Sequence, residues 1–154
     1  MWGLLFLGAI ASADNLVEGD RIRIHYNDYG TWNSGSYGEG FQMGPYEGGW
    51  RDVTFAGSPW QQISFAWDQG GSSHDYKGNY SSGSWGWSME DATDMSADGF
   101  NEMLHRWRMG DLEVVKTEAW ATPDQVMLIS FRITNNGGST ATNLRIMHAV
   151  DPDQ

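Results

Sequence analysis

Residues 104–150 decide the fold of this chain. They contain LHRWRM at 104–109, LEVVKTEAWA at 112–121, QVMLISFRIT at 125–134 and NLRIMHAV at 143–150. Apolar side chains occupy every second position of residues 127–133, which is typical of a β-strand with one buried face. The intervening segments, Gly110-Asp111, Thr122-Pro123-Asp124 and Asn135-Asn136-Gly137-Gly138, have the residue types of β-turns. The sequence therefore predicts a C-terminal meander of four antiparallel strands.

The two hairpins on either side of residues 112–121 favour different core faces for this strand. A two-residue turn at Gly110-Asp111 pairs Trp107 with Val114, which places the even-numbered residues of the strand in the core. Pairing with residues 125–134 instead favours the odd-numbered positions 115, 117 and 119. A β-bulge near Val114–Val115, or a strand covered on both faces, would reconcile the two registers.

The preceding part of the chain predicts further strands separated by long loops. Residues 21–26 alternate isoleucine with polar side chains, and residues 50–55 and 60–67 are the next strand candidates. Much of the remainder of residues 27–101 has a Gly, Ser, Asn, Trp and Tyr composition typical of loops, and we interpret the acidic run at 90–98 as a charged loop face. No segment shows convincing helical periodicity. We expect an all-β fold, an antiparallel β-sandwich with long Gly/Trp-rich loops.

Composition excludes several classes of protein. The 154 residues include 20 Asp and Glu but 9 Lys and Arg, a net charge of −11 with a sequence pI near 4.5. Nucleic acids and anionic membrane surfaces both require a basic face, so we expect neither as a partner. Because the chain has no cysteine, disulfides and cysteine zinc sites are excluded.

One hairpin resembles a known group of proteins. Residues 129–153, ISFRITNNGGSTATNLRIMHAVDPD, are similar to a hairpin with a polar Asn-Gly turn in bacterial secreted and cell-surface β-sandwich proteins. Those proteins have immunoglobulin-like or mutarotase-like sandwiches. The resemblance covers 25 of the 154 residues and implies the same sandwich fold for this chain.

The N-terminus has features of a secretory signal peptide. Residues 1–13, MWGLLFLGAIASA, combine an apolar run too short to span a bilayer with the small residues Ala11 and Ala13 at a cleavage position. No Lys or Arg precedes the run, so a first buried strand is the alternative. We expect residues 14–154 to form one domain, either complete or the N-terminal part of a longer protein. That domain would be secreted or displayed on the cell surface, with no membrane insertion after cleavage.

Aromatic side chains are the main candidates for ligand binding. Sugar rings stack on flat aromatic faces, and the surrounding loops supply amides and carboxylates for sugar hydroxyls. We predict five residues that bind a neutral polysaccharide or a cell-surface glycan: Trp60, Trp67, Tyr80, Trp85 and Trp87. Trp85 and Trp87 would share one side of an extended segment, about 7 Å apart. The alternative is that about half of the Trp rings in this region fill the core.

Two carboxylates near the C-terminus are candidates for a metal site. Asp151 and Asp153 flank a rigid proline and could ligate Ca²⁺, which prefers oxygen ligands. A solvated Asp-Pro turn is the alternative. The four histidines have no spacing typical of a zinc site.

The strand at 112–121 carries the candidates for catalysis. Asp111 and Glu113 lie on one face at a separation that suits a pair of glycosidase carboxylates, whereas an ordinary surface pair is the simpler interpretation. On the opposite face, Lys116 would neutralise Glu118 if that carboxylate is buried, a structural role without catalysis.

Three classes of function remain, and each has a different structural requirement. A non-catalytic glycan-binding or adhesive module requires exposed aromatic rings. A subunit of an extracellular assembly or filament requires apolar strand edges and Trp rings that are buried against other copies of the chain. A carbohydrate-active enzyme requires a cleft with two carboxylates of separated pKa. The aromatic-rich loops favour the first class.

Export should remove residues 1–13. The short apolar run followed by Ala11-Ser12-Ala13 places the cleavage before Asp14. N-terminal sequencing of the protein secreted by its native host should therefore begin at Asp14, and a mature protein that retains Met1 would contradict the prediction.

Overall fold

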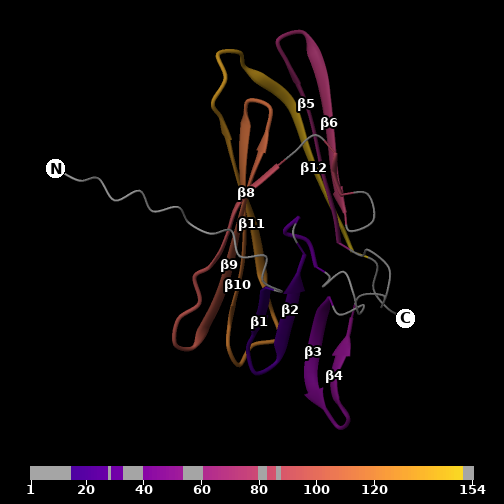
Figure 1. Cartoon of the computed structure of the whole chain (residues 1–154), viewed down its shortest axis with the longest axis vertical. Helices are drawn as coiled ribbons and strands as arrows, with labels where there is room; N and C mark the ends of the chain where they lie inside the picture. Colours follow the sequence, from indigo (N-terminus) through magenta and orange to yellow (C-terminus); the bar gives the residue numbers. More distant parts are fainter. Residues whose placement is uncertain are drawn as a thin grey trace, which may run out of the picture.

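The computed structural model describes residues 15–27, 29–32, 40–53, 61–79, 83–85 and 88–150, and the regular elements in these ranges are β-strands (Figure 1). They are β1 (Asn15–Glu18), β2 (Ile22–Tyr26), β3 (Phe41–Tyr46), β4 (Gly49–Asp52), β5 (Gln61–Gln69), β6 (Ser72–Asn79), β7 (Gly83–Trp85), β8 (Ser88–Asp94), β9 (Phe100–Met109), β10 (Leu112–Ala121), β11 (Leu128–Asn135) and β12 (Ala141–Val150). The sheets are antiparallel, with the orders β1-β2-β3-β4, β11-β10-β9-β8 and β12-β5-β6-β7. The predicted all-β, antiparallel sandwich is confirmed.

The sheet β8–β11 forms one layer, and the two other sheets pack against it. Figure 1 shows this sheet running along the molecule, with β5, β6 and β12 beside one end and β1–β4 beside the other. One core cluster joins Phe65 and Trp67 of β5 to Trp107 of β9. A second joins Ile24 of β2 to Trp120 of β10. Full burial of an aliphatic or Phe side chain in such a cluster stabilises the fold by roughly 1.5–3 kcal/mol.

The structure settles the register of β10. Trp107 lies opposite Val114, as the two-residue turn predicts, and Val114 lies opposite Ile133 on the other side without a register shift. The core face of β10 therefore carries the even-numbered residues, and the preference for positions 115, 117 and 119 as the core face is wrong. Val115 is nevertheless buried on the other face, so β10 is covered on both faces at this point.

The last predicted strand lies in the opposite layer. β12 pairs with β5, with Ile146 opposite Phe65 and His148 opposite Ile63. The four-strand meander is therefore β8–β11, and residues 136–140 carry the chain from one layer to the other. Turn residues specify that a chain reverses direction, but they do not specify whether the next strand joins the same sheet. For this reason the sequence pattern wrongly predicted that residues 125–134 and 143–150 pair as a hairpin in one sheet.

Residues 68–101 are more regular than their composition indicates. β6, β7 and β8 lie in this segment, which the sequence predicts as loop. Gly, Ser and Asp have low strand propensity, but pairing with β5 and β9 supplies backbone hydrogen bonds whatever the side chain. Glu90, Asp91 and Asp94 consequently lie on an edge strand rather than on a loop.

The three sheets meet at a group of buried polar side chains. Lys116 and Glu118 of β10 have no exposed surface, and their Nζ and Oε2 atoms form an ion pair at 3.0 Å. Glu118 Oε1 accepts hydrogen bonds from Trp32 Nε1 (2.9 Å) and Gln61 Nε2 (3.2 Å). Lys116 Nζ donates to the carbonyl oxygen of Gly30 (2.6 Å). The pair thus connects β10 to β5, in a second sheet, and to the segment that follows β2 of the third sheet.

Loss of one member of this pair should cost more stability than replacement of both. Lys116→Met leaves the Glu118 carboxylate buried without its counter-ion, which typically costs roughly 3–5 kcal/mol. In the double variant Lys116→Met, Glu118→Gln, no charge is left buried without a counter-ion, and the amide oxygen introduced at position 118 can still accept hydrogen bonds from Trp32 and Gln61. We therefore expect much of the lost free energy of unfolding to be recovered. Urea unfolding at neutral pH measures both free energies. A double variant less stable than Lys116→Met would contradict this account.

Candidate functional site

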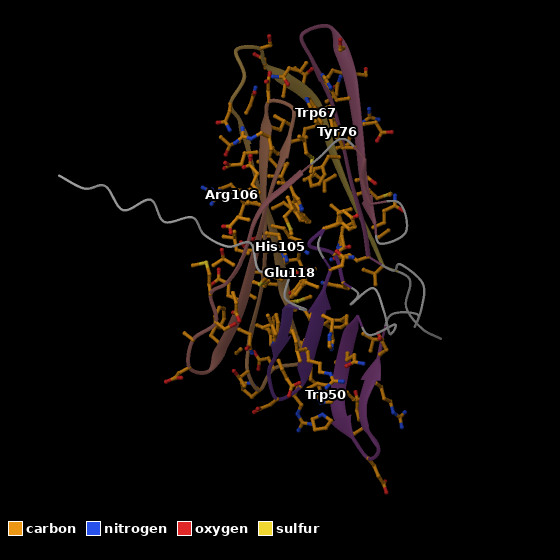
Figure 2. The ribbon with its side chains drawn as sticks, in the orientation of Figure 1. Trp50, Trp67, Tyr76, His105, Arg106 and Glu118 are labelled. Atoms are coloured by element: carbon orange, nitrogen blue, oxygen red, sulfur yellow. The ribbon has the colours of Figure 1, made fainter. Side chains whose placement is uncertain are left out.

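A groove of about 600 Å³ opens at the end of the molecule where the β1–β4 sheet packs. The β1–β2 turn, the β3–β4 hairpin and the β10–β11 turn supply its lining residues, which are Glu18, Gly19, Asp20, Arg21, Pro45, Trp50 and Pro123. Figure 2 shows Trp50 at this end, away from His105 and Glu118 at the junction of the sheets. The groove brings an indole ring together with two carboxylates and a guanidinium group.

Backbone contacts hold the β1–β2 turn at the groove. Asp20 N donates a hydrogen bond to Thr122 O (2.9 Å), and Arg21 O accepts one from Gly44 N (3.0 Å). A Cβ atom at Gly19 would lie 2.7 and 2.9 Å from side-chain nitrogen atoms of β9 and β10, so this close approach requires glycine. The β10–β11 turn and β3 therefore hold the β1–β2 turn in place by hydrogen bonds, and Gly19 packs closely against β9 and β10. Because the turn is ordered without a ligand, the entropic cost of ordering it on binding is reduced.

Trp50 forms the aromatic wall of the groove. The side chain is half-buried on β4, and the guanidinium of Arg23 lies over its ring, 5.1 Å from the centroid. Arg23 is itself held by the side chain of Gln42 and by Glu18, whose Oε2 lies 3.6 Å from Arg23 Nη1. A cation–π contact at such a site is worth about 0.5–1 kcal/mol. It fixes the orientation of the indole beside the groove.

The groove has the chemistry of a binding site for hydroxyl groups. Glu18 and Asp20 supply carboxylate acceptors, and Arg21 supplies fixed donors. A glycosidase acid requires a carboxyl group in an apolar, desolvated environment that raises its pKa. Both carboxylates of this groove are instead exposed to solvent. The geometry therefore favours ligand binding over hydrolysis.

A smaller pocket of about 220 Å³ lies at the opposite end of the molecule. It is formed by the β5–β6 turn, the β9–β10 turn and the β11–β12 connection, and it is lined by Trp67, Gln69, Gly70, His74, Gly110, Asp111 and Ser139. The Trp67 ring stacks on His74 and Tyr76, with centroid separations of 4.9 and 5.0 Å. Its Nε1 donates to Gln69 Oε1 (3.2 Å). Trp67 is therefore part of an internal aromatic stack.

The structure describes the side chain of one of the five predicted glycan-binding residues. Trp67 is 1% exposed and belongs to the core. The prediction that its ring is exposed and stacks on a sugar is therefore wrong. Alternate positions of β5 face the opposite layer, and position 67 is one of them. Trp85 lies on β7, but its side chain is not described. The three remaining glycan-binding candidates, Trp60, Tyr80 and Trp87, lie outside the described residues, as do the Ca²⁺ candidates Asp151 and Asp153.

Sequence reasoning missed the groove because its parts are distant in the chain. Trp50 belongs to the aromatic-rich region, but Glu18, Asp20 and Arg21 form a short strand connection with no motif. The available signal was a run of charged residues around Gly19. Its proximity to Trp50 arises from the pairing of β2 with β3 and of β3 with β4.

The buried carboxylate at the junction has a structural role. Glu118 is completely buried beside Lys116, so the sequence-based expectation of neutralisation is confirmed. Burial raises the pKa of the nearby Tyr26 hydroxyl, and the charge of Glu118 raises it further. Asp111 is exposed and Glu113 is partly exposed, as an ordinary surface pair would be.

His105 should make the fold sensitive to acid. The ring is completely buried, with its centroid 4.7 Å from that of Tyr26 and 6.0 Å from that of Trp107. Burial lowers the pKa of His105 well below its ordinary value of 6.5, and the charge of Lys116 lowers it further. Below about pH 6.5 the unfolded chain therefore binds a proton that the folded protein does not, so stability is lost as the pH falls.

We expect the melting temperature to decrease from about pH 7.5 to about pH 5, and to decrease less in the variant His105→Phe, which cannot take up this proton. Calorimetry of both proteins across this range measures the difference. Parallel curves for the two proteins would contradict the assignment.

In the part of the chain that the structure describes, no group of three or more His, Cys, Asp or Glu side chains is arranged to hold a metal ion. A search of the same residues finds no helix of the length and apolar character needed to cross a membrane. Comparisons with protein-family models, curated proteins and solved structures find no match to this chain.

Proposed function

We propose that this chain is a secreted or cell-surface protein that binds a neutral glycan without cleaving it. The observation that carries the proposal is the groove of about 600 Å³ in which Trp50 lies beside Glu18 and Asp20. The face of an indole matches the apolar face of a sugar ring, and the carboxylates accept hydrogen bonds from sugar hydroxyls. The guanidinium of Arg21 adds donors for ring or hydroxyl oxygens.

The charge of the protein supports an uncharged ligand. A net charge of −11 repels polyanions, whereas stacking and hydrogen bonding to a neutral sugar do not depend on the net charge. The groove is open rather than enclosed, so an internal segment of a long polysaccharide can lie across it. Only one aromatic wall is available among its lining residues, and we therefore expect modest affinity.

Removal of the Trp50 ring should abolish most of the glycan binding. A loss of about 1.4 kcal/mol raises Kd about tenfold, and the stacking contact of an indole supplies at least that amount once its apolar area is included. We expect Trp50→Ala to bind insoluble neutral polysaccharides, such as cellulose, chitin and peptidoglycan, at least about tenfold more weakly than the unaltered chain. Pull-down isotherms on each polysaccharide measure the effect.

Tyr46→Ala is the matched control for this experiment. Tyr46 is an exposed aromatic residue on the neighbouring strand β3, with Arg51 over its ring, but it does not line the groove. It should bind as the unaltered chain does. If Trp50→Ala binds normally while Trp85→Ala with Trp87→Ala does not, the groove assignment is wrong and the aromatic-rich loops are the site. If no neutral glycan binds the unaltered chain, the proposed function is wrong.

A further inference from the structure

The long sheet β8–β11 has two edge strands that can accept a further strand. In the described part of the chain β11 pairs with β10 alone, and β8 pairs with β9 alone. The outer backbone groups of an edge strand are available to pair with another chain, and proteins usually protect them with lysine or proline. β11, with the sequence LISFRITN, has neither, and Arg132 is its one charged residue.

Apolar side chains are exposed along the side of the sandwich formed by β11 and β12. Ile146 and Val150 lie on the inner face of β12, opposite Phe65 and Gln61, yet they are 42% and 39% exposed. The inner residues of β11, at positions 129, 131 and 133, are only partly buried. Other exposed apolar residues on this side are Val126, Leu128, Leu144 and Met147. The interior of the sandwich is therefore open to solvent along this side.

The two edges of the sheet have opposite charge character. Residues 125–150 contain no Asp or Glu and include Arg132 and Arg145, although the whole chain has 20 acidic residues. β8 carries Glu90, Asp91 and Asp94 and has no basic residue. A β8 edge is consequently complementary in charge to a β11 edge.

The charge complementarity lies on the outer face of the sheet, and the inner face of both edges is mainly apolar. On β8, Met89, Ala92 and Asp94 lie opposite buried residues of β9 and therefore on the inner face, where Asp94 is exposed at the end of the strand, whereas Asp91 lies on the outer face. On β11, Phe131 lies on the inner face and Arg132 on the outer face. A β8 strand beside β11 would therefore place Met89 and Ala92 on the same inner face as Phe131, and Asp91 on the same outer face as Arg132. Cross-strand pairs of these kinds each stabilise a sheet by about 0.2–1 kcal/mol.

Strand direction also suits this pairing. The four strands alternate in direction across the sheet, so β8 and β11 run in opposite directions. A second copy displaced sideways along the sheet would thus present β8 antiparallel to β11. A two-fold contact of β11 with another β11 would instead place the Arg132 side chains of both copies on the same face. Like charges on paired strands repel each other and destabilise the pairing.

We propose that copies of this chain associate head to tail, with β8 of one copy adding to β11 of the next, so that the long sheet continues from copy to copy. Such a contact is heterologous, and it leaves a free β11 edge and a free β8 edge at the two ends of the assembly. The assembly therefore grows as an open chain or closes as a ring. This proposal does not depend on glycan binding, because the Trp50 groove is lined by other elements.

Charge reversal on either edge tests the proposal. We expect the unaltered chain to show a weight-average mass that rises continuously with concentration in sedimentation velocity. Arg132→Asp and Asp91→Arg each place like charges across the joint, so each should require a severalfold higher concentration for the same mass. In an equimolar mixture of the two variants both joints are complementary again, and the assembly should be restored. The double variant in one chain should also assemble.

Arg51→Asp is the matched control, because Arg51 is an exposed arginine on β4, away from both edges. It should assemble as the unaltered chain does, and circular dichroism checks that every variant is folded. A monomer at all concentrations would overturn the proposal. So would a discrete dimer that Asp91→Arg does not affect, since this would indicate a two-fold contact, or a mixture of the two variants that stays monomeric.

Discussion

The ion pair between Lys116 and Glu118 is the contact on which the placement of the three sheets depends. Burying two charges is costly, and the cost is offset only where each charge has further hydrogen-bond partners. Lys116 obtains one from Gly30, and Glu118 obtains two from Trp32 and Gln61. Gln61 is the first residue of β5, and Gly30 and Trp32 lie in the segment that follows β2, so a shift of either part relative to β10 would leave a buried charge incompletely bonded.

The same pair accounts for the conformation of the segment after β2. Gly30 has a φ of 72°, and a Cβ atom there would lie 2.7 Å from His105 Cδ2, so only glycine allows its carbonyl to reach Lys116. The side chain of Asn27 accepts hydrogen bonds from the backbone nitrogens of Tyr29 and Thr31, which closes the turn. The conformation of the turn from Asn27 to Thr31 thus depends on the charge of Lys116, which lies on β10.

With its centre fixed in this way, the sandwich presents its candidate functional surfaces at its periphery. The Trp50 groove lies at one end, where three turns converge on a rigid frame. The edges of the long sheet lie along the sides and carry opposite charge. The tryptophans divide between these roles, since Trp32, Trp67, Trp107 and Trp120 are buried whereas Trp50 is half-exposed at the groove. The aromatic-rich composition of this chain therefore reflects core packing in four of these residues and a partly exposed ring at the groove in the fifth.

Local features of the sequence were sufficient for the strands predicted at 104–109, 112–121 and 125–134, although β9 begins earlier, at Phe100, and β11 begins later, at Leu128. They were also sufficient for the turn at Gly110-Asp111 and for the neutralisation of Glu118 by Lys116. Alternation of side chains and turn chemistry act over a few neighbouring residues, and both are visible in a single sequence. The tertiary structure alone decided that β12 joins β5, that β6, β7 and β8 are strands and that Trp50 meets Glu18 and Asp20. Those outcomes depend on which surfaces pack together across the whole chain. Packing of this kind brings distant segments into contact and leaves no periodic signal in any one of them.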